Sequence, residues 1–114
     1  MSKVAEQPDL DLNAHDWEEI KRILKALVPG YEVWAFGSRV KGTAKPYSDL
    51  DLVVVSEQPL PIATMADLRE SFDESDLTIK VDVVDWAVTS SSFRKIIADQ
   101  KVVVQVGEKR DEDQ

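Results

Sequence analysis

Residues 37–52 read GSRVKGTAKPYSDLDL and hold two short motifs that rarely occur together. Gly37-Ser38 ends an apolar run and opens a turn or short helix. Asp49-Leu50-Asp51 begins eleven residues after Ser38 and leads into three consecutive valines. The first motif suits phosphate and the second suits a divalent metal. Together they indicate a nucleoside triphosphate with magnesium, and hence nucleotidyl transfer.

The acid pair is placed by strand geometry. Successive side chains of a strand point to opposite faces, so Asp49 and Asp51 share one face, ~7 Å apart along the chain. Two unpaired carboxylates repel each other and favour a cation between them, and magnesium prefers oxygen ligands. The alternative is that both acids are charges on a solvated strand edge.

The Gly-Ser pair offers backbone donors. Gly37 permits a sharp turn after an expected strand at 31–36 and a close approach of ligand. Ser38 adds a hydroxyl and an amide near a helix start, where phosphate binds well. The alternative is an ordinary strand-to-helix turn in which Ser38 is the helix cap. The stretch matches neither a Walker A loop nor a dinucleotide fingerprint.

A third acid is expected on a later strand, residues 78–84. Its core face carries Ile79, Val81 and Val83, so Asp82 projects from the opposite face, as a site residue should. Asp85 has the opposite parity and is interpreted as a turn or cap acid.

The order of elements predicts an α/β fold with a single mixed β-sheet and helices packed against it. We expect a domain over 13–107, a loosely ordered N-terminus over 1–12 and a charged flexible tail over 108–114. Trp34 and Trp86 belong to the core or its rim, or stack on a base or a partner. The expected helices begin after a cap at Asn13 or Asp11, at 39–42, at 63–75 and after a cap within Ser90-Ser91-Ser92, and the expected strands span 31–36, 49–55, 78–84 and 102–104.

Composition narrows the class of protein. The net charge is −8, from 22 acidic and 14 basic residues, which disfavours direct DNA binding. There are no cysteines and one histidine, so a thiolate or multi-histidine metal site is excluded. No apolar run approaches a membrane span and no signal peptide is present, which indicates a cytoplasmic protein. Arg39, Lys41 and Lys45 form a small basic rim near the expected phosphate position.

The combined pattern of Gly37-Ser38, Asp49-Leu50-Asp51 and Asp82 resembles the polymerase-beta-like nucleotidyltransferases. The phrases WAFGSRVKG and YSDLDL are most similar to the minimal nucleotidyltransferases, and the resemblance covers about residues 13–104. It implies that Asp49, Asp51 and Asp82 are catalytic and bind two magnesium ions, and that ATP or another nucleoside triphosphate is the substrate. The nucleotide-binding set that it implies is Gly37, Ser38, Arg39, Lys41 and Ser48.

The resemblance also implies a partner. The catalytic lobe occupies nearly all of the chain, so we expect acceptor binding to come from another protein or subunit. In this family the partner is often a small helical HEPN protein encoded by the adjacent gene, and the pair is similar to a toxin–antitoxin module. The nucleotidyltransferase would act as antitoxin by transferring AMP to a hydroxyl of the toxin.

The alternative is a catalytically weak nucleotide-binding subunit that neutralises or regulates its partner by complex formation only. Either Asp51 or Asp82 could help to deprotonate the acceptor.

Overall fold

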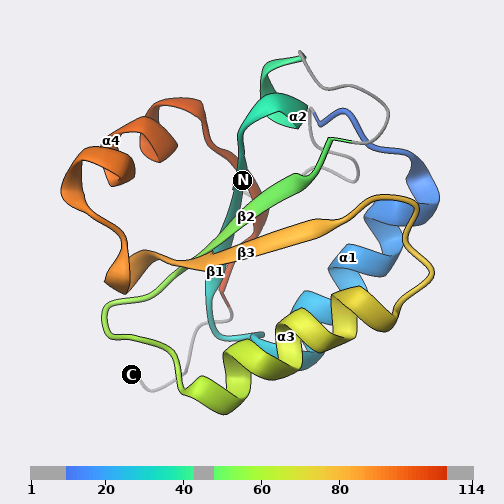
Figure 1. The fold of residues 1–114 in the computed structure, drawn as a ribbon, viewed down its shortest axis with the longest axis horizontal. Helices are drawn as coiled ribbons and strands as arrows, with labels where there is room; N and C mark the ends of the chain where they lie inside the picture. The colour runs from blue at the N-terminus through green and yellow to red at the C-terminus, as the bar shows by residue number, and fades with distance from the viewer. Residues whose placement is uncertain (1–9, 43–47, 108–114) are drawn as a thin grey trace.

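The computed structural model describes residues 10–42 and 48–107 of the chain, in one layer of strands with helices on both sides (Figure 1). None of the helices in these residues has the length and apolar character needed to cross a membrane. The elements follow in the order α1 (Ala14–Leu27), β1 (Glu32–Phe36), α2 (Ser38–Lys41), β2 (Leu50–Val55), α3 (Ile62–Glu74), β3 (Val81–Asp85), the 3-10 helix η1 (Trp86–Val88), α4 (Ser91–Gln100) and β4 (Val102–Gln105).

The strands form one mixed sheet in the order β3-β2-β1-β4. β1 is antiparallel to its neighbours β2 and β4, whereas β2 and β3 run parallel. Parallel neighbours need a crossover connection, and α3 supplies it. The predicted α/β architecture, a single mixed sheet with packed helices, is confirmed.

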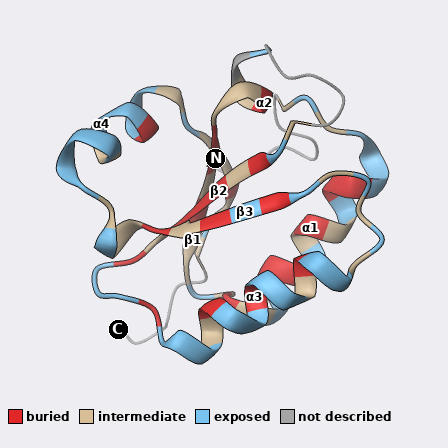
Figure 2. Ribbon diagram, viewed as in Figure 1, coloured by how far each residue is buried: buried red, intermediate tan, exposed pale blue. Residues whose placement is uncertain are grey.

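One face of the sheet is buried beneath α1 and α3 (Figure 2). Alternate residues of the strands point to this face, as strand geometry requires. Trp17, Ile20 and Leu24 of α1 and Leu68 and Phe72 of α3 close it from the other side, all of them buried. A large apolar side chain removed from water contributes about 1.5–3 kcal/mol to stability. The strand residues in this core are Val33, Ala35, Leu50, Leu52, Val54, Val81, Val83 and Val104.

The opposite face is covered only in part, by α4. Ile97 packs against Phe36 and Val53 there. Beside them the rings of Trp34 and Trp86 meet edge to face, with centroids 5.2 Å apart. Both tryptophans are half-buried, which places them at the rim of this second cluster, and stacking on a base or a partner stays a prediction.

The helix ends agree with the expected signals. Asn13, rather than Asp11, caps α1, because its side-chain oxygen accepts the Asp16 amide at 2.7 Å. α1 ends at Leu27, just before Pro29-Gly30. Ser90 caps α4 by accepting the Phe93 amide at 3.2 Å.

Two differences from the expected elements have local causes. β3 begins at Val81 and not at Thr78, because the Thr78 amide donates to the buried Asp16 carboxylate at 3.1 Å instead of to a strand. η1 was not predicted; it begins where the Asp85 side chain accepts the Ala87 amide. β2 begins at Leu50, one residue later than expected.

The N-terminal boundary is also earlier than predicted. Leu10 and Leu12 pack against the main core, and the Asp11 amide donates to the Arg39 carbonyl at 2.9 Å. Residues 10–12 are therefore part of the folded unit. The rest of the expected loose N-terminus, 1–9, and the expected tail, 108–114, lie outside the described residues.

Candidate active site

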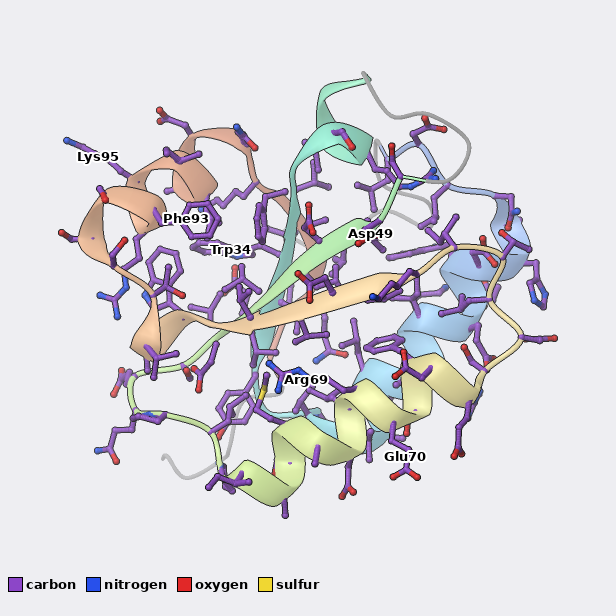
Figure 3. The ribbon with its side chains drawn as sticks, viewed as in Figure 1. Trp34, Asp49, Arg69, Glu70, Phe93 and Lys95 are labelled. Carbon is purple, nitrogen blue, oxygen red and sulfur yellow. The ribbon has the colours of Figure 1, made fainter. Side chains whose placement is uncertain are left out.

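Two acids lie side by side on neighbouring parallel strands. Asp51 of β2 pairs in register with Asp82 of β3. Their strand neighbours Leu50 and Val81 are buried, whereas Asp51 is half-buried and Asp82 is exposed, so both carboxylates are on the face opposite α1 and α3. Asp49 is exposed and immediately precedes β2, at the end of the strand near α2 (Figure 3). The fold thus brings the three predicted acids to one end of the partly covered face.

The electrostatics of this cluster favour a bound cation. Burial raises the pKa of the Asp51 carboxyl above its ordinary value, and the negative charges of Asp82 and Asp49 raise it further. Each of these causes penalises the ionised form of Asp51. A positive charge placed among the three acids would relieve the same penalty.

Gly37 lies directly against the acid cluster. It follows Phe36, the β1 residue that pairs with Asp51. Its backbone has φ 91° and ψ −159°, a conformation almost confined to glycine. A Cβ atom at this position would also lie only 2.5 Å from Asp51 Oδ2. The Gly-Ser turn (Gly37 and Ser38) and the acid pair, which lie apart in the sequence, therefore adjoin each other.

Ser38 begins a single helical turn. Gly37, not Ser38, occupies the cap position of α2, and no side chain caps the helix. α2 closes after Lys41 at Gly42, which has φ 77° and whose amide donates to the Ser38 carbonyl. The interpretation of Ser38 as a helix cap is therefore wrong; Ser38 is the first residue of α2 and follows directly on the glycine that lies against Asp51.

The donor set of the cluster fits magnesium. Carboxylates are the hard oxygen ligands that this ion prefers. Within residues 10–42 and 48–107, however, no three His, Asp or Glu side chains converge closely enough to enclose an ion unaided. Magnesium commonly takes several of its ligands from water and from substrate phosphates, so a metal at these carboxylates would not need a complete protein shell.

Comparison with known proteins agrees with this geometry. Residues 17–111 match the family model of the nucleotidyltransferase domain. The chain belongs to this family. It is 54% identical over 100 residues to the probable protein adenylyltransferase MntA of Haemophilus influenzae, covering 88% of each chain. The resemblance inferred from the sequence motifs is confirmed.

Solved structures share the fold of this nucleotidyltransferase. A chain from a crystal structure of a toxin–antitoxin pair with AMP-PNP matches with a TM-score of 0.67 and 24% identity, over 86% of this chain and 78% of that one. A second match is a chain from a structure of the complex between the tri-AMPylated HEPN toxin of Shewanella oneidensis and an MNT antitoxin. Its TM-score is 0.60 and its identity 20%, over 87% of this chain and 76% of that one.

Asp85 of the nucleotidyltransferase is a structural acid. It is buried, and its carboxylate accepts the Ser56 hydroxyl at 2.6 Å, the Leu60 amide at 2.8 Å and the Ala87 amide at 3.1 Å. These contacts join the end of β3 to the segment before α3. The expected opposite parity of Asp82 and Asp85 is therefore observed.

Arg39 has a different environment from the one its position in the sequence suggested. Its side chain is buried; Nε donates to the Ser48 carbonyl at 3.0 Å and Nη1 to the Asp11 carbonyl at 2.7 Å. It therefore ties α2 to the start of β2 and to the N-terminal segment. The side chain of Lys41 and all of Lys45, the other members of the expected basic rim, lie outside the described residues.

Two residues near the site were not recognised from the sequence. Gln100, at the end of α4, accepts the Gly37 amide through Oε1 at 3.1 Å. Lys80 immediately precedes β3, and its carbonyl accepts the Leu50 amide at 2.9 Å, which places it beside Asp49. The expected strand alternation already placed Lys80 on the face of Asp82, but no role at the site was assigned to it. Gln100 could not have been noticed, because 63 residues separate it from Gly37.

Proposed function

We propose that this nucleotidyltransferase transfers AMP from ATP to a hydroxyl of a HEPN-type partner protein and acts as the antitoxin of the pair. The observation that carries the proposal is the pairing of Asp51 with Asp82 beside Gly37, since it sets an acid cluster against the Gly-Ser turn. The strong likeness to a protein named as an adenylyltransferase supports AMP as the transferred group.

The residues divide into two groups of ligands. Asp49, Asp51 and Asp82 would hold two magnesium ions, as in other sites of two-metal catalysis. When bound, magnesium supplies positive charge that offsets the charge of the phosphates and of the departing pyrophosphate. The amide and hydroxyl of Ser38 would hold phosphate oxygens, assisted by Lys41 and by Ser48. Arg39 is proposed as a positioning residue that fixes the Ser48 carbonyl.

The reaction is an in-line displacement at the α-phosphorus. The acceptor hydroxyl oxygen forms a bond to that phosphorus, and the bond to the bridging oxygen of the β-phosphate breaks. Pyrophosphate leaves, and the hydroxyl proton passes to a carboxylate of the acid cluster, Asp51 or Asp82. The protein contributes orientation of the two reactants and a fixed electrostatic environment.

A helical partner is the proposed acceptor. Solved toxin–antitoxin complexes contain chains of this fold, and one contains an AMPylated HEPN toxin. The net charge of −8 favours a partner with a basic face, as a protein that binds RNA would have. Such a pair would act in the cytoplasm, where ATP and magnesium are available.

The test is transfer of label. The chain is co-expressed with the HEPN-type product of its adjacent gene, and the purified pair is incubated with magnesium and ATP labelled at the α-phosphate. We expect co-elution in size exclusion and label on the partner. Asp49→Asn, Asp51→Asn and Asp82→Asn should each lower the rate by orders of magnitude, because each removes one carboxylate of the cluster.

Asp73→Asn is the matched control, since it removes one exposed acid from α3, on the other side of the sheet. It should transfer label at the wild-type rate. A stable complex that never becomes labelled would contradict the transferase and would favour the alternative of neutralisation by binding alone. Separate elution of the two proteins at micromolar concentration would contradict the partnership.

A further inference from the structure

Gln100 occupies a position that strand pairing leaves vacant. Trp34 pairs with Val103 and Ala35 with Val102, so the same register continued by two residues sets Gly37 opposite Gln100. β4 begins only at Val102, and Gln100 is the last residue of α4. The Gly37 amide meets the side-chain oxygen of Gln100, at 3.1 Å, at the place where a further β4 residue would lie if the register continued.

This contact acts on the one peptide that joins β1 to the Gly-Ser turn. Gly37 has no side chain to restrict its backbone, and its conformation lies in a region that other residues avoid. Holding its amide fixes the direction in which the chain leaves β1. The same residue lies against Asp51, so its position also limits where that carboxylate can lie.

We propose that Gln100 is a positioning residue of the nucleotide site. It holds the Gly-Ser turn in the orientation that presents Ser38 to phosphate and keeps Gly37 against Asp51. The Gly37 amide is then a structural donor, and phosphate is left to Ser38 and the residues that follow. This inference rests on the proposed function, because it assigns a role within the same site.

The test compares two substitutions at one position. Gln100→Met keeps the length of the side chain but has no oxygen acceptor, whereas Gln100→Glu keeps the acceptor and adds a charge. Gln105→Met is the matched control: Gln105 donates from Nε2 to the Val28 and Tyr31 carbonyls, both at 2.9 Å, outside the site. The measurements are hydrogen exchange of the Gly37 amide without nucleotide, KM for ATP, kcat and the urea midpoint.

We expect Gln100→Met to speed exchange of the Gly37 amide and to raise KM for ATP about threefold to tenfold, the value of one hydrogen bond. Gln105→Met should leave the exchange of the Gly37 amide and the KM for ATP unchanged. It should lower the urea midpoint at least as much as Gln100→Met does. Gln100→Glu should restore protection of the Gly37 amide, and its added charge should still weaken ATP binding. That separation distinguishes positioning of the turn from a general loss of stability.

Unchanged exchange of Gly37 in Gln100→Met, or an equal rise of KM in Gln100→Met and Gln105→Met, would overturn this inference alone. Failure of the wild-type chain to bind ATP would overturn the proposed function and this inference with it. A wild type that binds ATP but transfers no AMP would overturn transfer only, and the ATP affinity of Gln100→Met would still decide the role of Gln100.

Discussion

At the scale of single residues, Asp51 carries a cost that the fold tolerates. Its pKa is raised by burial and by two neighbouring acids. A carboxyl with a raised pKa binds its proton more tightly in the folded state, so stability falls as pH rises from the ordinary value of 3.8 to the folded value. At neutral pH the ionised Asp51 carboxylate therefore lowers the stability of the metal-free folded state.

Asp51→Asn should consequently stabilise the metal-free protein. Asparagine keeps the shape of the side chain but removes its charge. We expect a higher urea midpoint than that of the wild type at pH 7 and a smaller difference at pH 4, where more of Asp51 is protonated in the native protein. Asp73→Asn controls for the loss of one negative charge elsewhere. A lower midpoint for Asp51→Asn at pH 7 would show that its carboxylate is stabilised in the native state.

Gly37 is required for two separate reasons, its backbone conformation and its contact with Asp51. Gly37→Ala should cost about 1–3 kcal/mol of stability from backbone strain and should push the Asp51 carboxylate aside. Transfer should then fall further than stability alone explains. Gly30→Ala is the control, because a Cβ at Gly30 meets nothing within 4 Å. Equal activity of the two variants would separate Gly37 from the site.

At the scale of elements, strand β3 carries one acid for each face. Asp82→Ala should lower the transfer rate by orders of magnitude and leave the free energy of unfolding unchanged or raised, since it relieves repulsion. Asp85→Ala should do the reverse. It removes the acceptor of three hydrogen bonds at a buried position, which should cost about 2–4 kcal/mol and spare the rate.

Chemical denaturation and transfer assays on the two variants check this assignment. The expected cost for Asp85 exceeds that of an ordinary turn or cap acid, because its carboxylate also holds Ser56 and Leu60 on another segment. A large loss of rate in Asp85→Ala with its stability intact would reverse the roles of the two acids.

Element α4 joins two regions of the molecule. Its Phe93 ring packs edge to face on Phe36, with centroids 5.7 Å apart, and its last residue contacts Gly37. Figure 3 shows Phe93 and Trp34 on the α4 side and Asp49 near α2. The helix thus packs on the same face of the sheet that carries the acids, and its C-terminal end reaches the turn beside them.

At the scale of the whole molecule, metal and nucleotide should bind together. The described acids do not enclose an ion unaided, and each ligand supplies charge or oxygens that the other needs. We expect magnesium alone and ATP alone to raise Tm little, and the two together to raise it clearly, because ligands that bind only the folded state stabilise it. Thermal unfolding in the four conditions measures this. Asp49→Asn should abolish the joint increase, and equal increases with and without magnesium would contradict the shared site.

The strand faces, the helix caps and the family resemblance could be predicted, because each depends on a short stretch of sequence. Alternation along 78–84 places Asp82 opposite Val81 and Val83, and an added residue in the strand would change that face. The caps at Asn13 and Ser90 act over three residues. The resemblance to the family was carried by the short motifs Gly37-Ser38 and Asp49-Leu50-Asp51 with Asp82.

Other features depended on contacts between distant segments. From its place after the Gly-Ser pair, Arg39 looked like a rim cation, yet it is buried and holds the Asp11 and Ser48 carbonyls. A guanidinium can serve phosphate or main-chain carbonyls equally well, and only its three-dimensional neighbours decide which. Asp85 is similar, since its partners Ser56 and Leu60 precede it by more than twenty residues.

The sequence by itself indicated the fold class through strand periodicity, the family through a resemblance carried by a short motif, and Asp49, Asp51 and Asp82 as predicted site residues, because alternation and short motifs are properties of local segments. The tertiary structure decided that Asp51 pairs with Asp82, that Gly37 lies against Asp51, and that Gln100 holds the Gly37 amide. The first two depend on sheet register, which is set by burying the apolar face of every strand at once, and the third depends on where α4 ends. No segment carries that information alone, because the core that fixes the register is built from all four strands and the helices α1 and α3.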